Sequence, residues 1–307
     1  MKKFILYTLL SIFIFSSVDA KKNNSFSKDK SYNGEFKWGY VDYKFPKGDW
    51  TFFHKAYSTL PGTSLKTRCI EFYQKENGTL KGLFEVCEIV TGGKWTPQIA
   101  RILSEMLKNG IHDNCTLRAE YFYAQLFTKG TAMNCFLIRH IDPFKEFNYP
   151  DDPQARVKYL KIFLKKKNIK IPKTMILSKH LFFAPSIKDK GVEINYSINP
   201  ELFGAPKTLN GDENGSEYHR NNINNHVFKK KFINDWLSKQ ANYHQYFEKK
   251  LKAKKNHLLN LDEFITFEIS VGNNNLLIEQ LKSLNEFYKS GILSKDEFKK
   301  AKKKILN

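Results

Sequence analysis

The feature that most constrains the fold is a pair of alternating segments joined by a tight-turn dipeptide. Residues 66–74 and 80–90 each alternate apolar and polar side chains, and Asn77-Gly78 lies between them. Alternation with a period of two is typical of a half-buried strand, and Asn-Gly favours a two-residue turn. The sequence therefore predicts a β-hairpin over these residues.

The register of this hairpin has two consequences. If the loop is centred on Gly78, Cys69 lies opposite Cys87 and Glu71 lies opposite Glu85. A slip of one residue would separate the two cysteines, because register decides which side chains share a face. We predict that Cys69 and Cys87 form a disulfide across the hairpin. Two buried free thiols are the alternative.

Cys115 and Cys135 complete an even set of four cysteines, all in the first half of the chain. In an oxidising compartment such a set indicates disulfides, with three pairings open. Zinc sites usually take ligands closer together in sequence. With the first pair bonded, Cys115 and Cys135 either pair with each other or stay free. A second hairpin is expected to place Cys135 opposite Ala124 rather than opposite Cys115.

The N-terminus predicts export. Lys2 and Lys3 precede an apolar run over 4–15, and small residues follow up to Ala20. This is the pattern of a cleavable signal peptide over 1–20. A membrane anchor needs about 20 apolar residues, and the run is shorter. We expect cleavage after Ala20, a periplasmic or secreted protein, and no transmembrane segment in the mature chain.

The rest of the pattern predicts an α+β fold. We expect mixed antiparallel sheet or sheets with packed helices, followed by a short C-terminal helical hairpin. The expected strands, besides the first hairpin, lie in 37–53, 117–128, 133–141, 174–184, 192–198 and 264–271. The expected helices cover 96–109, 154–168 and 224–257. Residues 210–225 are rich in Asn and Gly and predict a long loop.

These elements suggest a division of the chain into five parts. They are a signal peptide (1–20), a flexible leader (21–36), a disulfide-containing α+β unit (37–150), a second α+β unit or a continuation of the same domain (151–272), and the terminal hairpin (276–306).

The hairpin at 276–306 has clear cap signals. Gly291 stands where a helix C′ glycine belongs, and Ser294 with Glu297 forms a capping box for a second helix. Leu281 and Leu284 lie near one face of the first helix. A segment of about 30 residues buries too little apolar surface to fold alone, so it must dock on something.

This segment resembles the short C-terminal (SHOCT) domain found at the ends of many bacterial proteins. The matching residues are Leu281, Leu284, Gly291 to Ser294, Glu297, Phe298, Lys302, Ile305 and Leu306. The resemblance implies oligomerisation or partner binding, and no catalytic residues. An ordinary helix-turn-helix cap is the alternative. We recognise no family in residues 21–275.

The charge is strongly basic, at +20. Such a charge favours anionic partners such as nucleic acid, membrane surfaces or polyanionic glycans. Only 6 of the 51 basic residues are Arg, the side chain that binds phosphate in a bidentate fork. The composition therefore favours a solvated lysine surface, and no specific nucleic-acid motif is present. A dedicated anion-binding face would require the lysines of 165–173 and 229–255 to converge.

No motif assigns a catalytic, cofactor-binding or metal-ligating residue. His219 and His226 would share a helical face, with Glu217 as a third ligand for a metal, only if their loop were helical. His140 and His180 would act as general bases only if a nucleophile or carboxylate lay near. We interpret each of these histidines as structural or surface residues and expect no cofactor.

These observations favour an exported, non-enzymatic binding or structural protein with a C-terminal module for oligomerisation or partner docking. Two alternatives remain open. One is a secreted or periplasmic hydrolase, which a deep pocket uniting His140 or His180 with a carboxylate would favour. The other is a basic module that binds anionic polymers or a membrane surface.

Overall fold

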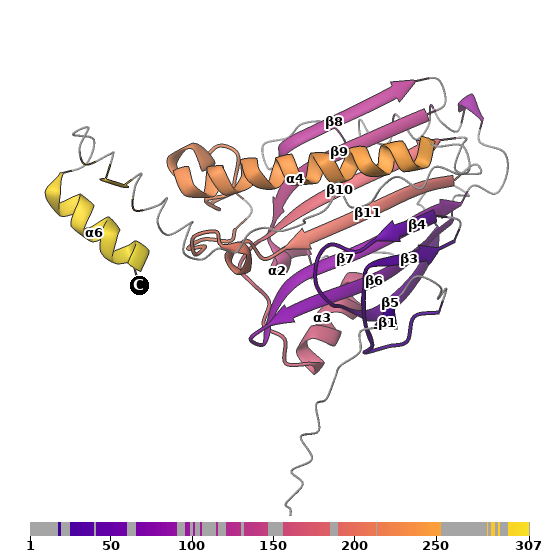
Figure 1. Ribbon diagram of the computed structural model, residues 1–307, viewed down its shortest axis with the longest axis horizontal. Helices are drawn as coiled ribbons and strands as arrows, with labels where there is room; N and C mark the ends of the chain where they lie inside the picture. The colour runs from indigo at the N-terminus through magenta and orange to yellow at the C-terminus, as the bar shows by residue number, and fades with distance from the viewer. Residues whose placement is uncertain are drawn as a thin grey trace, which may run out of the picture.

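The computed structural model describes residues 18–19, 25–39, 41–59, 66–90, 96–98, 101, 105, 115, 121–129, 132–146, 156–184, 190–212, 214–252, 281, 284–285, 288 and 294–306. Within these residues a nine-stranded sheet has the order β1-β2-β5-β6-β7-β11-β10-β9-β8 (Figure 1). Its strands are β1 (Val18–Asp19), β2 (Ser31–Asn33), β5 (Trp50–Thr59), β6 (Lys66–Glu76), β7 (Thr79–Val90), β8 (Tyr121–Lys129), β9 (Ala132–Ile141), β10 (Met175–Ala184) and β11 (Lys190–Ile198). All neighbouring strands are antiparallel except β1 and β2.

The remaining elements pack around this sheet or belong to the tail. A separate hairpin consists of β3 (Glu35–Trp38) and β4 (Val41–Lys44). The helices are α2 (Pro143–Glu146), α3 (Arg156–Lys166), α4 (Val227–Lys252) and α6 (Lys295–Leu306), with the 3₁₀ turns η3 (Pro200–Phe203) and η4 (Ile223–Asn225). The expected α+β class is therefore correct in outline, although the fold is mostly sheet.

The predicted first hairpin is present with the predicted register. Cys69 lies opposite Cys87 and Glu71 opposite Glu85 in the β6–β7 pair. Asn77 and Gly78 both have positive φ, at 49° and 72°, as a type I′ turn requires. The dipeptide thus adopts the one conformation that its sequence favours.

The two halves of the chain share this sheet. β11 and β10, from the second half, lie between β7 and β9, from the first. Residues 37–150 and 151–272 therefore contribute strands to one sheet rather than to two. Each strand inserted between the two hairpins hydrogen-bonds on both sides, which removes two sheet edges.

One face of the sheet, called the α4 face here, holds an aromatic core. α4 lies across β9 and β10 on this face, and the β3–β4 hairpin covers β6 and β7. Trp50 packs 5.5 Å from Phe84 and 5.6 Å from Tyr196, and Trp236 of α4 packs 5.2 Å from the same tyrosine, between ring centroids. Burial of these large rings is the main source of stability on this side.

The opposite face, called the α3 face, is covered in part by α3. Phe163 of this helix stacks on Phe53 at 5.1 Å and meets Tyr73 edge-on at 5.3 Å, between ring centroids. Leu160 and Leu164 are buried in the same cluster. α3 and α4 thus lie on opposite sides of one sheet.

The leader predicted over 21–36 is wrong for its second part. Phe26 is only 7% exposed, and its ring meets Tyr32 and Phe72 at 5.0 Å. β2 and the start of β3 also fall within the predicted leader. The segment is mostly polar, but it contains Phe26 and Tyr32, which are both buried. The free energy gained by burying these two rings outweighs the conformational entropy lost when the chain around them is ordered.

The Asn-rich segment 210–225 is a loop, as expected, but it is ordered and packed. Tyr218 is fully buried. Asp212 Oδ1 accepts hydrogen bonds from the amides of Asn214 and Gly215, and Asn222 Nδ2 donates to the Ser216 carbonyl. Side chains of this kind replace regular secondary structure by bonding the backbone locally.

Some expectations fall on residues outside the described part of the chain. These are the strand expected over 264–271 and the signal peptide expected over 1–20, of which the structure describes β1 alone. In the helix expected over 96–109, Pro97, Gln98, Arg101 and Glu105 are helical. The helix expected over 224–257 appears as α4, which is continuous over 26 residues.

Both cysteine pairs lie at disulfide-bonding distance. The Cα atoms of Cys69 and Cys87 are 4.0 Å apart, and those of Cys115 and Cys135 are 5.9 Å apart. In the β8–β9 hairpin, Cys135 lies opposite Leu126 rather than Ala124. The second pair therefore joins β9 to a residue outside that hairpin, which hairpin symmetry could not indicate.

We predict that Cys69 and Cys87 are bonded and that their loss destabilises the body. They are separated by 18 residues, so the double variant Cys69→Ala/Cys87→Ala should lose about 3 kcal/mol of unfolding free energy. Chemical denaturation measures this loss, and peptide mapping without reduction identifies the bond. The double variant of Cys115 and Cys135 is the matched control, because it should retain the mapped peptide pair. Alkylation of all four cysteines in unreduced protein would contradict the prediction.

Candidate functional site

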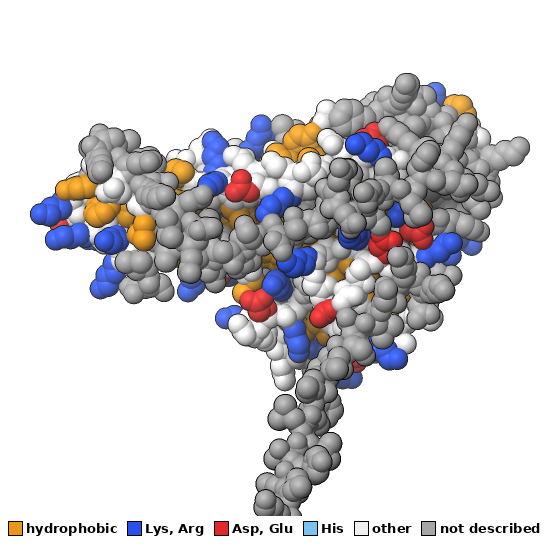
Figure 2. All heavy atoms as spheres, in the orientation of Figure 1, with side chains coloured by type: hydrophobic (Ala, Val, Ile, Leu, Met, Phe, Trp, Pro, Cys, Tyr) orange, Lys and Arg blue, Asp and Glu red, His pale blue; other side chains and the backbone are white. Residues whose placement is uncertain are grey.

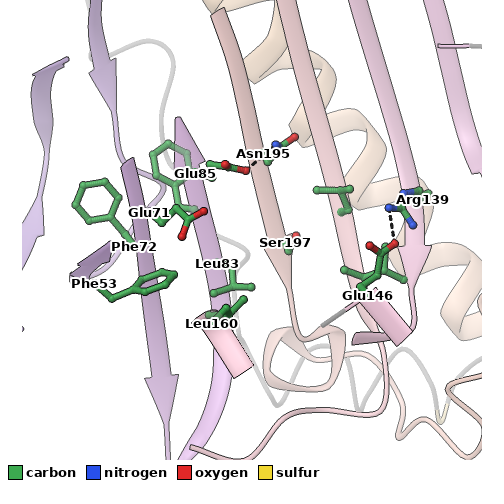
Figure 3. A pocket seen from close by; sticks show the side chains of 13 residues that line it. Phe53, Glu71, Phe72, Leu83, Glu85, Arg139, Glu146, Leu160, Asn195 and Ser197 are labelled. Carbon is green, nitrogen blue, oxygen red and sulfur yellow. Dashed lines mark hydrogen bonds and ion pairs between the residues drawn. The ribbon is translucent and has the colours of Figure 1, made fainter. Parts of the chain in front are cut away.

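A cavity of about 130 Å³ lies on the α3 face, where α2 and α3 approach the sheet (Figure 3). It joins strands from both halves of the chain. Its lining residues are Phe53, Glu71, Phe72, Leu83, Phe84, Glu85, Arg139, Ile141, Glu146, Leu160, Leu177, Asn195 and Ser197. A concave space with a few convergent polar groups and apolar walls is the usual form of a small-ligand site.

Two glutamates form one end of the cavity. Glu71 and Glu85 lie directly opposite each other on β6 and β7, and they are 5% and 7% exposed. Asn195, the cross-strand neighbour on β11, donates from Nδ2 to Glu85 Oε2 at 2.8 Å and to Glu193 Oε1 at 2.7 Å. The amide therefore holds Glu85 in one orientation, as Figure 3 shows.

Two basic residues of this face form ion pairs. Lys179 Nζ lies 3.1 Å from Glu193 Oε1, and Arg139 Nη2 donates to Glu146 Oε1 at 2.6 Å. Among the described residues, four glutamates and two basic side chains lie in this region.

Local sequence explains the position of Glu146. Asp142 caps α2 through its Oδ1 atom, which accepts from the amides of Phe144 and Lys145 at 2.9 and 3.3 Å. Pro143 occupies the first helical position, where no amide donor is needed. The short helix that results places Glu146 beside Arg139 on β9.

The other walls of the cavity are apolar. Leu83 and Leu177 come from β7 and β10, Leu160 comes from α3, and Phe53 lies between the sheet and that helix. The site therefore has a carboxylate end and an aliphatic end, with the Arg139–Glu146 pair on the far side in Figure 3.

The first cysteine pair borders the acidic end. Cys87 Sγ lies 3.1 Å from Glu85 Oε1. Ligand-type atoms of Cys69, Glu85 and Cys87 all lie within 4.8 Å, the one such group of three in the part of the chain that the structure describes. Sulfur atoms in a disulfide offer no thiolate to a metal, so this group is better read as a bridge beside a carboxylate.

The α4 face holds a buried histidine network. His180 Nδ1 lies 3.1 Å from His244 Nδ1, and His180 Nε2 lies 3.1 Å from Gln240 Oε1. His244 Nε2 hydrogen-bonds Asn134. Burial lowers the pKa of His180 well below its ordinary value, and the neighbouring His244 lowers that pKa further. Burial lowers the pKa of His244 to about 3.

Neutral histidines restrict the protons of this network. Only one of the two Nδ1 atoms can donate, because each neutral ring carries one N–H. Contacts with Asn134 Oδ1, with Gln240 Oε1 and between the two Nδ1 atoms would each need one N–H, whereas two neutral rings carry two. The two rings therefore cannot donate in all three contacts.

The structure separates the metal ligands considered from sequence. Glu217 pairs with Lys229, with 3.3 Å between Oε2 and Nζ. His219 Nδ1 accepts from the Asn221 amide at 3.2 Å. His226 ends the η4 turn. These three residues therefore do not gather as a ligand set.

The rings of His140 and His219 lie close together, although the sequence suggested different roles for these two residues. Their ring centroids are 5.7 Å apart in an edge-on arrangement. Like His180, His140 lies on the α4 face, so neither residue reaches the cavity on the α3 face.

The lysine-rich helices do not converge. α3 and α4 cover opposite faces of the sheet. Figure 2 shows Lys and Arg side chains distributed over the visible surface, with Asp and Glu between them. No helix of the described residues is long and apolar enough to cross a membrane.

The tail begins its last helix with the predicted capping box. The Ser294 amide donates to Glu297 Oε2 at 2.9 Å, and the Glu297 amide donates back to Ser294 Oγ at 3.4 Å. The rings of Tyr288 and Phe298 lie 4.8 Å apart. The described residues thus form a capped last helix that contacts the helical segment before it.

The tail is a short C-terminal module of known type. Residues 279–306 match the SHOCT family, described as the Short C-terminal domain. The resemblance seen in the sequence is therefore confirmed. Searches of curated proteins and of solved structures gave no significant match.

We predict that the histidine network makes the body sensitive to acid. The pKa of His244 is 6.5 in an unfolded chain and about 3 when folded, so the unfolded state binds more protons between these values. Stability is thus fully present above pH 6.5 and falls as the pH drops toward 3. At pH 5 this residue alone should cost about 2 kcal/mol.

Denaturation at pH 7 and pH 5 measures the effect. His244→Phe should reduce the stability difference between the two pH values, even if it destabilises the protein at both. His226→Asn changes a histidine outside the network and should retain the difference. An equal pH dependence in wild type and His244→Phe would contradict the prediction.

Proposed function

We propose that the chain is an exported, non-enzymatic binding protein whose C-terminal hairpin joins copies of the chain to each other. The single observation that carries the proposal is the match of residues 279–306 to the SHOCT family. Its members are proposed to mediate oligomerisation or binding, and the module has no catalytic group of its own. In such an assembly the sheet body would be the part that binds a ligand or partner.

The physical argument starts from the size of the tail. A helical hairpin of about 30 residues has too little apolar surface to be stable alone. Leu284 is buried, whereas the neighbouring Asn285 is exposed. Phe298 is partly buried against Tyr288, and most other described residues of α6 are exposed. A second copy of the same module is the simplest partner that matches its small apolar surface, because a symmetric interface uses one patch twice.

Two observations make the hydrolase less suitable as an explanation. His140 and His180 lie on the α4 face, whereas the cavity lies on the α3 face. The polar contacts of His180 are with His244 and Gln240, which supply neither a nucleophile nor a carboxylate. The described residues that line the cavity include no histidine.

The basic module also receives little support. A basic module requires the lysines near α3 to lie on the same face as those of α4. The two helices lie on opposite sides of the sheet. Lysines distributed over a surface keep a protein solvated without forming a specific anion site.

Removal of the tail tests the assembly role. Deletion of residues 276–307 should leave the thermal unfolding of the body unchanged and lower the molar mass of the assembly. Multi-angle light scattering measures that mass. If the mass is the same before and after deletion, the tail does not mediate self-association.

Two point variants give a sharper test. Leu284→Asp places a charge at a buried position and should lower the assembly mass as the deletion does, because an unpaired buried charge is costly. Asn285→Asp introduces the same charge at the adjacent exposed position and is the matched control. Equal masses for the two variants would show that the apolar face of the hairpin is not the interface.

A further inference from the structure

A lysine, an asparagine and a glutamate meet between β10 and β11 on the α3 face. Lys179 and Asn195 are directly opposed cross-strand partners, and Glu193 precedes Asn195 by two positions on β11. We propose that Lys179 and Asn195 are covalently joined by an isopeptide bond from Lys179 Nζ to Asn195 Cγ, and that Glu193 carries the protons of this reaction. This inference concerns the sheet body and is independent of the assembly role of the tail.

The first argument is the proximity of the reacting groups. Directly opposed residues have Cβ atoms about 5 Å apart, which lies within the reach of a lysine side chain. Lys179 Nζ lies 3.1 Å from Glu193 Oε1, and Asn195 Nδ2 donates to the same oxygen atom at 2.7 Å. One carboxylate oxygen therefore holds the amine and the amide next to each other, which favours reaction between them.

The second argument is the apolar surroundings. The side chains of Lys179 and Glu193 are 11% and 20% exposed. Their cross-strand neighbours, Leu137 and Leu181, are 0% and 2% exposed. Burial disfavours the charged forms of an amine and of a carboxylic acid. Transfer of a proton from Lys179 to Glu193 leaves both groups neutral, and a neutral amine is the form in which lysine is a nucleophile.

The reaction needs no reagent beyond these three side chains. Lys179 Nζ attacks Asn195 Cγ, and the bond between Cγ and Nδ2 breaks. Glu193 gives its proton to the leaving nitrogen, with which it is already in contact, and takes one from the attacking nitrogen. The products are one secondary amide and ammonia, which departs with the remaining proton as ammonium. The carboxylate is returned unchanged, and no atom is oxidised or reduced.

The bond would join two central strands of the sheet. β10 and β11 lie between β7 and β9, so the sheet cannot come apart at this point while the bond is intact. A crosslink stabilises a fold mainly by restricting the unfolded chain. Unlike the two cysteine pairs, an amide crosslink is not cleaved by reducing agents.

Mass spectrometry of the purified full chain tests the proposal. After reduction of the cysteines, the mass should lie about 17 Da below that of the sequence, because one ammonia molecule is lost. A tryptic digest should contain two peptides joined through Lys179 and Asn195, without cleavage after Lys179. Lys179→Arg should restore the sequence mass, because a guanidinium stays protonated. Lys81→Arg is the matched control, since Lys81 pairs with Glu76 at 2.6 Å outside this cluster, and it should retain the mass loss.

Glu193→Gln keeps both reacting groups but removes the proton carrier. It should slow bond formation about a hundredfold, so that freshly purified protein has the full sequence mass. Unchanged bond formation in this variant would show that Glu193 does not carry the protons.

A second source of the same mass loss is ring closure at Asn77-Gly78, and the experiment separates the two. Ring closure persists in Lys179→Arg and leaves trypsin cleavage after Lys179 intact. The proposal is wrong if the wild-type chain has the full sequence mass, if the loss persists in Lys179→Arg, or if Lys81→Arg also removes it. The wild-type digest decides the question even where a variant does not fold. None of these results affects the proposed role of the tail, since that role is measured by the mass of the assembly.

Discussion

The pairing of β6 with β7 is the constraint on which the rest of the structure depends. Its register places Cys69 opposite Cys87 and Glu71 opposite Glu85 on the α3 face. The residues between them, Ile70 included, then enter the aromatic core on the other face. A slip of one residue would exchange the two faces. Core packing, the cysteine bridge and the acidic end of the cavity are therefore consequences of the same set of backbone hydrogen bonds.

The order of strands in the sheet also brings residues from both halves of the chain to the candidate site. β11 pairs with β7, so Asn195 comes to lie beside Glu85 although the two residues are 110 positions apart. β10 then brings Leu177 to the same face, and β9 brings Arg139. Because such contacts close long loops, they depend on correct pairing of strands from both halves. The cavity cannot exist in either half alone.

Each face of the sheet carries a cluster of buried polar residues within an apolar layer. On the α4 face it is the His180–His244 network, and on the α3 face it is the pair Glu71 and Glu85 with Asn195. Buried polar groups cost free energy unless they are hydrogen-bonded. Gln240 and Asn134 flank the histidine network, and Gln240 Nε2 is buried there without a hydrogen-bond partner. Beside the acidic pair, Asn195 Oδ1 is a buried oxygen of the same kind.

Local signals were enough to predict the first hairpin, the capping box at Ser294, and the SHOCT resemblance, because turns and caps are determined by residues a few positions apart. The same signals also placed Glu71 opposite Glu85, which was the available hint of the site. The burial of Phe26, the pairing of Cys115 with Cys135 and the order of strands β7, β11 and β10 were decided only by tertiary structure. Each of these depends on which distant apolar surfaces meet, and periodicity within one segment contains no information about its partner.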